Sequence, residues 1–137
     1  SYFGQKDFQQ FKIVEGLVRE LMFNTELRCI PIQREADGLA MSSRNMRLDE
    51  VERTKAVVFY QALQLAKKRL DEGLSMAQIK KEAKAFCEDI PGIQLEYLEL
   101  ADMANFVVME NVTSNAVLLI AGYVGEVRLI DNLLVNE

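Results

Sequence analysis

The stretch AVLLIAGYVGEVRLIDNLLV, residues 116–135, contains two apolar runs that are separated by Gly125. Short runs rich in aliphatic residues and bounded by glycine are typical of buried β-strands. Glycine adopts the backbone conformations that tight turns require, so we expect such a turn at Gly125. The stretch therefore predicts two strands joined by a tight turn.

A long amphipathic segment, LDEVERTKAVVFYQALQLAKKRLDEG, occupies residues 48–73. Asp49 and Glu52 have the spacing of a capping box at its start. Basic residues near the other end suit the helix dipole, and Gly73 is a typical helix-ending residue. The segment predicts one long helix.

A second helix and a third strand follow the long helix. Ser75 and Gln78 predict the start of the second helix, and the pair Pro91-Gly92 ends it. We expect one face of this helix to carry Met76, Ile79, Ala83 and Phe86. IQLEYLEL, residues 93–100, has the character of a strand. Together these signals predict an α+β domain over residues 46–137, with about two helices and a three-stranded antiparallel sheet.

The first part of the chain has the helix–strand order of an α/β sheet. Tyr2-Phe3-Gly4 resembles the end of a buried strand that turns into a helix. Apolar residues then recur at helical spacing from Asp7 to about Phe23, and Asp7 with Gln10 resembles a capping pair. Residues 26–32 contain β-formers and predict a strand. This order indicates a piece of an α/β sheet.

The composition fits an ordinary globular protein, and the length is about that of one domain. The 137 residues carry a net charge of −5, which argues against a nucleic-acid-binding surface, because such surfaces are basic. No apolar run is long enough to cross a bilayer. The chain has no histidine, so it cannot supply histidine acid–base catalysis or histidine metal ligands. Cys29 and Cys87 lie in apolar contexts, which favours buried free thiols over a disulfide or a metal pair.

The first cluster that could carry chemistry is GQKDFQQ, residues 4–10. Gly4 allows a ligand to approach the backbone closely, and the start of the following helix favours a phosphate. Lys6 adds a positive charge, Asp7 an acceptor and Gln10 an amide. The alternative interpretation is purely structural, with Asp7 capping the helix and Lys6 in solvent.

The second cluster is READGLAMSSRN, residues 34–45. Ser42, Ser43 and Arg44 can donate together to several phosphate oxygens, and the arginine fork matches their geometry. Asp37-Gly38 predicts a turn before them that could act as a hinge. The alternative is a serine helix cap with a surface arginine.

Taken in this order, the two clusters resemble one known family. YFGQKDFQQ, a helix, a strand and then IPIQREADGLAMSSRN closely resemble the pantothenate synthetase family, whose members are also called pantoate–β-alanine ligases. VRLIDN, residues 127–132, is similar to the C-terminal signature of that family. The family belongs to the nucleotidylyl transferases, and its Met-Ser-Ser-Arg segment is similar to the KMSKS loop of class I aminoacyl-tRNA synthetases.

The resemblance implies a division into domains and a set of binding residues. Residues 1–45 would be the C-terminal remnant of a Rossmann-like ATP- and pantoate-binding domain, and residues 46–137 a lid domain. Gln10 would bind pantoate. Lys6 and the Ser42–Arg44 segment would bind the ATP phosphates. The full set of implied ATP-binding residues is Gly4, Gln5, Lys6, Asp7, Gln33, Met41, Ser42, Ser43 and Arg44.

The implied reaction has two steps and uses ATP with Mg²⁺. The carboxylate of pantoate attacks the α-phosphate of ATP to give pantoyl adenylate and pyrophosphate, and the amine of β-alanine then displaces AMP. The resemblance also implies a cytoplasmic homodimer without nucleic-acid or membrane partners.

One departure from the family pattern is large. The HxGH motif of the family and the acidic residues near Mg²⁺ lie upstream of the matching region, and this chain has no histidine. We therefore expect the chain to be the C-terminal half of the enzyme, without catalytic or metal residues of its own and inactive by itself. The alternative is a non-catalytic nucleotide-binding or interaction module derived from the family.

Overall fold

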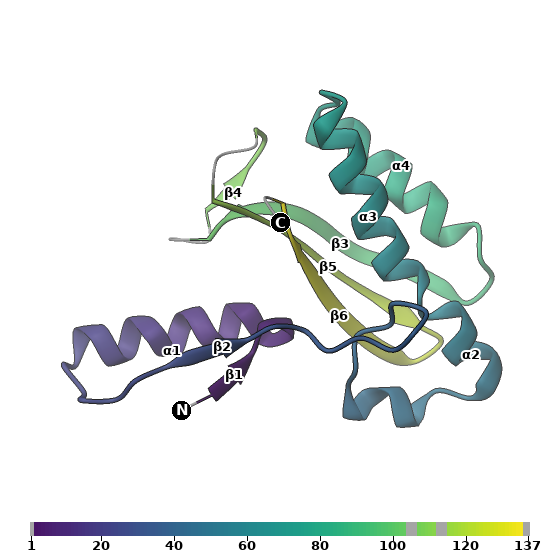
Figure 1. The fold of residues 1–137 in the computed structure, drawn as a ribbon. Helices are drawn as coiled ribbons and strands as arrows, with labels where there is room; N and C mark the ends of the chain where they lie inside the picture. Colours follow the sequence, from purple (N-terminus) through teal and green to yellow (C-terminus); the bar gives the residue numbers. More distant parts are fainter. Residues whose placement is uncertain (1, 104–106, 112–114, 136–137) are drawn as a thin grey trace. The chain divides into compact units, whose positions relative to one another are not determined.

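The computed structural model describes residues 2–103, 107–111 and 115–135 (Figure 1). The chain consists of two compact units, Ser1–Gln33 and Arg34–Glu137. The sequence predicted a boundary later in the chain, near residue 45, and the assignment of residues 1–45 to a nucleotide-binding domain stays a prediction. Across the described ranges, no helix has both the length and the apolar character needed to span a membrane.

The first unit is a strand–helix–strand unit, as the sequence predicted. Strand β1 (Tyr2–Gly4) leads through a short 3₁₀ turn, η1 (Gln5–Asp7), into helix α1 (Phe8–Glu20), and strand β2 (Arg28–Ile30) follows. The two strands are parallel, with Gly4 opposite Ile30. Parallel pairing across a helix is the arrangement of α/β sheets.

Two details of the first helix differ from the prediction. The Asp7 side chain makes no capping hydrogen bond. Its backbone, at φ −96° and ψ 43°, lacks the extended conformation of a capping residue, because η1 runs directly into α1. The helix also ends at Glu20, before the predicted Phe23, and Met22 has a positive φ of 54°. A residue in that left-handed conformation cannot continue a right-handed helix.

The second unit is built on a four-stranded antiparallel sheet. Strands β3 (Ile93–Asp102), β4 (Val108–Met109), β5 (Ala116–Val124) and β6 (Val127–Leu134) lie in the order β4-β3-β5-β6. The predicted turn between the last two strands is confirmed, with Gly125 at φ +59°. The prediction of three strands missed β4, because two residues are too short to produce an apolar pattern.

Three helices accompany this sheet: α2 (Glu50–Lys55), α3 (Val58–Asp71) and α4 (Met76–Glu88). Both predicted capping boxes are confirmed, Asp49 with Glu52 and Ser75 with Gln78. The prediction of a single helix over residues 48–73 is wrong, because the chain tightens between α2 and α3. There the amide of Phe59 donates to the carbonyl of Ala56, three residues earlier, over 3.5 Å, and this spacing is that of a 3₁₀ turn.

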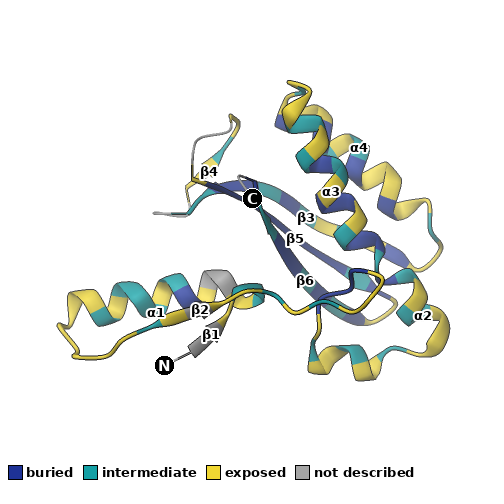
Figure 2. Cartoon of the chain, viewed as in Figure 1, coloured by how far each residue is buried: buried dark blue, intermediate teal, exposed yellow. Residues whose placement is uncertain are grey.

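Helices α3 and α4 cover one face of the sheet (Figures 1 and 2). Helix α3 packs on β5 and β6, and α4 packs on β3. The prediction for the apolar face of α4 was wrong at one position, since Phe86 is 40% exposed and Cys87 is buried instead. Cys87 lies four residues after Ala83 and therefore on the same face. The largest fully buried side chains include Leu63, Ile79, Leu100, Leu118 and Ile120.

The predicted free, buried thiol is confirmed for Cys87. Burial raises the pKa of this thiol to about 12, and the charge of Glu88 acts in the same direction. The side chain of Cys29 lies outside the described part of the structure.

Candidate functional site

The first cluster lies where β1 ends and the helical turn begins, within the first unit. Gly4 is the last residue of β1, and Gln5, Lys6 and Asp7 form η1. A side-chain carbon built on Gly4 would meet no atom within 4 Å, so the backbone there is open to a ligand. Gln10 is exposed in the first turn of α1. The predicted residues of this cluster are therefore close neighbours at the carboxyl end of a strand.

Gln33 lies beyond the end of the neighbouring strand. Strand β2 is parallel to β1 and ends at Ile30, opposite Gly4, and the exposed Gln33 follows three residues later. The carboxyl ends of parallel strands meet at one edge of a sheet, and this edge is where α/β proteins bind ligands. The structure places the chain leading to Gln33 beyond the same edge as the first cluster.

The second cluster belongs to the other unit and begins with a closed loop. The backbone pairs at an isolated bridge between Arg34 and Ala40, and the amide of Glu35 donates to the carbonyl of Leu39 over 2.8 Å. Gly38 is buried at φ +100°, and a side-chain carbon added to it would come within 2.6 Å of the Tyr60 ring. The predicted turn at Asp37-Gly38 is confirmed, and it packs against α3; its role as a hinge stays a prediction.

An ion pair also holds the turn. Arg53 of α2 donates to both carboxylate oxygens of Asp37, over 2.9 and 3.2 Å. The hydrogen bonds from Arg53 lower the pKa of the Asp37 carboxyl, and the same contact raises the pKa of Arg53. Both side chains are partly exposed, so we expect only a small contribution to stability.

The Met41–Arg44 segment leaves this closed loop and enters solvent. Met41, Ser43 and Arg44 are exposed and Ser42 is half-buried. The Ser42 hydroxyl accepts a hydrogen bond from the amide of Arg44 over 3.2 Å and caps a 3₁₀ helix, η2 (Ser43–Arg47). A hydroxyl that accepts one bond can still donate its proton, so the cap leaves Ser42 able to bind a phosphate oxygen.

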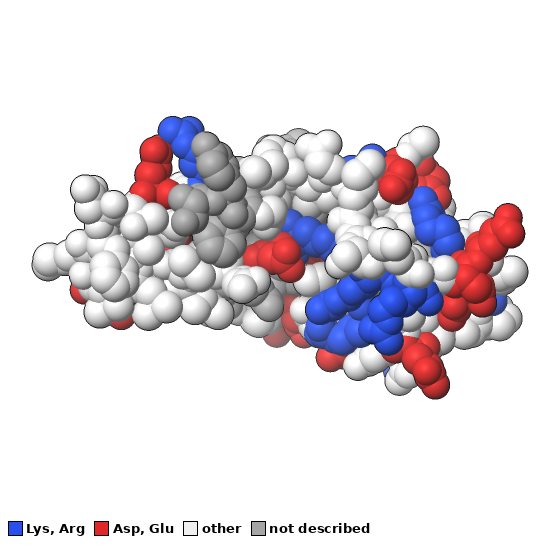
Figure 3. All heavy atoms as spheres, turned by 90° about the horizontal axis from the view of Figure 1, so that it is seen from below, with Lys and Arg blue, Asp and Glu red and all other residues white. Residues whose placement is uncertain are grey.

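A second arginine lies on the same short helix, and the sequence analysis did not select it. Arg44 and Arg47 are both exposed, and residues three apart line up in a 3₁₀ helix. The face of the molecule in Figure 3 shows lysine and arginine atoms gathered into one patch over the second unit. The three-residue spacing of Arg44 and Arg47 is the sequence signal from which Arg47 could have been selected.

The comparisons with known proteins identify the family. The model of the pantoate-beta-alanine ligase family matches residues 1–134. The chain belongs to this family. The pantothenate synthetase of Thermosipho melanesiensis is 43% identical over 99% of this chain and 49% of its own length. The chain thus spans about half the length of the curated relatives it matches.

Solved structures of pantoate-beta-alanine ligases share the fold of this chain. The pantothenate synthetase of Thermus thermophilus has a TM-score of 0.91 and 36% identity, and the match covers 99% of this chain and 49% of that one. The ligase of Francisella tularensis, solved in complex with beta-gamma ATP and beta-alanine, has a TM-score of 0.67 and 28% identity. That match covers 99% of this chain and 43% of the other.

The acidic residues of this chain do not gather into a metal site in the described ranges. No group of three or more His, Cys, Asp or Glu side chains there could hold a metal ion. We therefore assign no site among the described residues to the Mg²⁺ ion that the resemblance implies.

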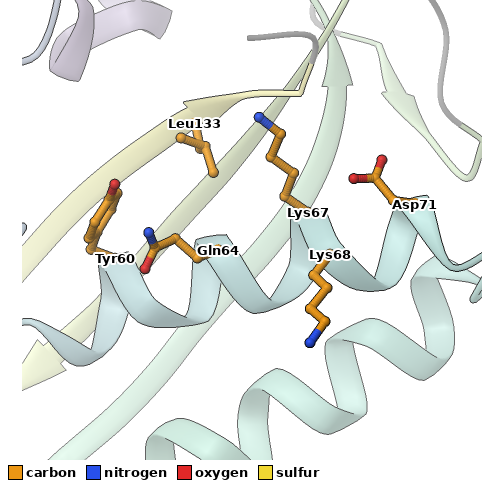
Figure 4. A pocket seen from close by; sticks show the side chains of 6 residues that line it. All are labelled: Tyr60, Gln64, Lys67, Lys68, Asp71 and Leu133. Carbon is orange, nitrogen blue, oxygen red and sulfur yellow. The ribbon is translucent and has the colours of Figure 1, made fainter.

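A pocket of about 350 Å³ lies apart from the predicted residues, between α3 and β6 (Figure 4). In Figure 4, Leu133 of β6 faces the side of α3 that carries Tyr60, Gln64 and Lys67, whereas Lys68 points away from Leu133. Tyr60 is also the residue against which Gly38 packs. The lining residues are Tyr60, Gln64, Lys67, Lys68, Asp71 and Leu133.

Proposed function

We propose that this chain supplies the C-terminal half of an ATP-dependent ligase that joins pantoate to β-alanine. The observation that carries the proposal is the match of 99% of the chain, at 43% identity, to a pantothenate synthetase. The reaction would activate the pantoate carboxylate as an adenylate, release pyrophosphate and then form the amide as AMP leaves. The proposed setting is cytoplasmic and the proposed assembly a homodimer.

The second cluster is proposed to bind the phosphates of ATP. Ser42 and Ser43 would donate their hydroxyl protons to phosphate oxygens, and Arg44 would donate from its guanidinium group. The exposure of Ser43 and Arg44, next to the half-buried Ser42 and directly after a packed turn, supports the assignment. Such donors stabilise the charge that develops on the phosphate oxygens as the carboxylate attacks. Met41 would lie over the nucleotide as part of the same segment.

The first cluster is proposed to bind the nucleoside and pantoate. The Gly4 backbone, with Gln5 and Asp7 beside it, would contact the ribose, and Lys6 would reach the phosphates. Its position at the carboxyl end of a parallel strand supports this assignment. The Gln10 amide would hold pantoate, and the Gln33 backbone would contact the adenine.

The apolar surface of the first unit supports the idea that a further part of the enzyme packs on it. Ile13 and Leu17 of α1 are 64% and 48% exposed, and Ile30 of β2 is 43% exposed. Parallel strands occur almost only in sheets with both faces covered, and the described residues of this unit form two of them. We therefore expect the chain alone to hold one wall of the ligase site and to be inactive.

A chimera tests the proposed function. The N-terminal half of the Thermosipho melanesiensis pantothenate synthetase would be joined to this chain, and AMP release would be followed with Mg-ATP, pantoate and β-alanine. We expect turnover from the chimera and none from the chain alone. Lys6→Ala should lower the rate of the chimera, whereas Lys12→Ala, a matched change on α1, should not.

Two results would count against this proposal. A chimera that unfolds cooperatively, and so is folded, but releases no AMP would refute the assignment of ligase function. Turnover by the chain alone that Lys6→Ala abolishes would show that the site is complete without a further half.

A further inference from the structure

Arg34, at the base of the closed loop, makes a bidentate, largely buried ion pair with Asp131 of the last strand, β6. Its Nη1 donates to Asp131 Oδ2 over 2.7 Å, and its Nη2 donates to Asp131 Oδ1 over 3.0 Å. Asp131 is only 6% exposed, so the pair is largely shielded from water. Paired hydrogen bonds of this kind fix the orientation of both groups as well as their distance.

The same guanidinium group contacts two further parts of the unit. Nη1 also donates to the carbonyl of Gly38 over 3.0 Å, and Nη2 donates to the carbonyl of Asn132 over 3.2 Å. The guanidinium carbon lies 4.0 Å from the centre of the Tyr60 ring, which is the geometry of a cation–π contact. Arg34 thus joins its own loop to β6 and to α3.

These contacts occupy the donors that a ligand would need. Each of the two terminal nitrogens of Arg34 carries two protons, and each nitrogen donates two hydrogen bonds. The group therefore has no terminal proton left for a phosphate. Arg34 is therefore a positioning residue: it would affect ligand binding by holding the loop and not by contacting the ligand.

The closed loop and the Met41–Arg44 segment after it form one longer loop, residues 34–44, which contacts the outer strand β6 at both of its ends. At its base, Arg34 binds the carbonyl of Asn132 together with the buried Asp131. At its tip, Arg44 donates to the carbonyl of Arg128 over 3.4 Å at an exposed site. The base is therefore held by the bonds of Arg34, while the tip can exchange its single long bond for another acceptor.

We propose that Arg34, through Asp131 and Tyr60, fixes the base of the loop so that Ser42–Arg44 are held ready for a phosphate chain. This inference rests on the proposed function, in which those residues bind the phosphates of ATP. A segment that is ordered before binding loses less conformational entropy when the ligand binds. Misplacing such donors by about 1 Å can lower a rate by about 100-fold.

The test uses the whole chain, labelled with ¹⁵N, and inorganic tripolyphosphate as the probe. Titration of the wild-type chain should shift the amide signals of residues 42–45. Amide hydrogen exchange at Glu35 and Gly38, whose N–H groups close the loop, reports on its base. Exchange at Leu63 and Leu118, both fully buried, reports on the core.

The main variant is Arg34→Lys, which keeps the positive charge but cannot make the four bonds. We expect tripolyphosphate to bind about 10- to 100-fold more weakly, with faster exchange at Glu35 and Gly38 and unchanged exchange in the core. Because the charge is retained, a purely electrostatic contribution of Arg34 would leave the affinity nearly unchanged. Arg69→Lys, the same change in an exposed ion pair of α3, is the matched control and should have no effect.

A milder variant covers the possibility that Arg34→Lys does not fold. Tyr60→Leu removes the ring face beneath the guanidinium group, together with the packing of that ring against Gly38. It keeps the ion pair with Asp131, so binding and loop exchange should change in the same direction, by a smaller factor. Unchanged exchange and affinity in a folded Arg34→Lys chain would overturn the inference, as would unchanged values in Tyr60→Leu if the first variant does not fold.

The two proposals fail in different ways. If tripolyphosphate leaves the signals of residues 42–45 of the wild-type chain unshifted, the phosphate-binding role of the loop is refuted, and the inference that depends on it falls too. If the wild-type chain binds and the Arg34→Lys chain binds equally well, only the positioning role of Arg34 is refuted.

Discussion

Replacing Gly122 by alanine should destabilise the second unit, because the backbone at this position lies directly under a buried ring. Gly122 is in the middle strand β5, and a side-chain carbon added there would contact Cε1 of Phe59 and lie 2.6 Å from its Cζ. The carbonyl oxygen of Gln94, on the neighbouring strand, would be 2.7 Å away. Non-bonded carbon atoms prefer separations of about 3.5–4.0 Å, so the ring would have to move by about 1 Å.

The size of the destabilisation depends on how far Phe59 and Gln94 can move away from the added methyl group. Phe59 is 4% exposed, which leaves the ring little room, and Gln94 is held by the pairing of β3 with β5. Overpacking of this kind costs about 1–3 kcal/mol, and two unyielding contacts favour the upper end of that range. For a unit of this size, each kcal/mol lowers the Tm by about 4–8 °C.

Urea unfolding followed by circular dichroism measures this change, and a second substitution identifies its cause. Phe59→Leu alone should also destabilise the unit, but in the double variant the smaller side chain relieves part of the clash. We therefore expect a coupling energy of at least about 1 kcal/mol between the two positions. Gly16→Ala in α1 is the control, because the added side-chain carbon would meet no atom within 4 Å outside the neighbouring helix backbone. This variant should not destabilise the chain. A Gly122→Ala chain as stable as the wild type, or strictly additive effects in the double variant, would refute this account of the packing.

Three further predictions concern the loop, a helix cap and the buried thiol. Arg44→Ala in the chimera should lower the rate of AMP release by about 100-fold, as loss of a transition-state donor does, without changing the Tm, and Arg69→Ala should leave the rate unchanged. Asp49→Ala removes one side of the capping box before α2 and should lower the free energy of unfolding by about 1 kcal/mol in urea titrations; no change would mean that the cap contributes nothing. In a Cys29→Ser chain, the Cys87 thiol should resist a thiol reagent at pH 8 until urea unfolds the protein. Its pKa of about 12 keeps the thiolate scarce at that pH, and rapid labelling of the folded chain would contradict the burial.

Local signals in the sequence predicted the parts of the fold that depend on neighbouring residues. The capping boxes at Asp49 and Ser75 and the turn at Gly125 each involve residues within a few positions of one another. The break between α2 and α3 could not be predicted in this way, because Ala56 and Val57 include neither glycine nor proline. Asp7 was misread because the 3₁₀ turn that it ends leaves no mark in the pattern of apolar residues.

The candidate site could be predicted only in part, for a similar reason. The strand-to-helix position of Gly4–Asp7 follows from the order of the elements, and the binding roles came from the family resemblance. The partner of Arg34 could not be found from the sequence, because Asp131 lies 97 residues away and contacts it only in the folded unit. The packing of Gly38 against Tyr60 could likewise not be found from the sequence, because the ring comes from a later helix.

The loop along β6 also bears on how the outer strand of the sheet is protected from non-specific pairing with other chains. An outer strand with free carbonyl groups is a template on which another chain can add a strand, and such pairing leads to aggregation. Arg34 and Arg44 occupy the carbonyls of Asn132 and Arg128, so the segment proposed to bind phosphate also shields this edge. Substitutions that release the loop should therefore reduce solubility as well as ligand binding, and a polyphosphate that draws Arg44 away would uncover the Arg128 end of the strand.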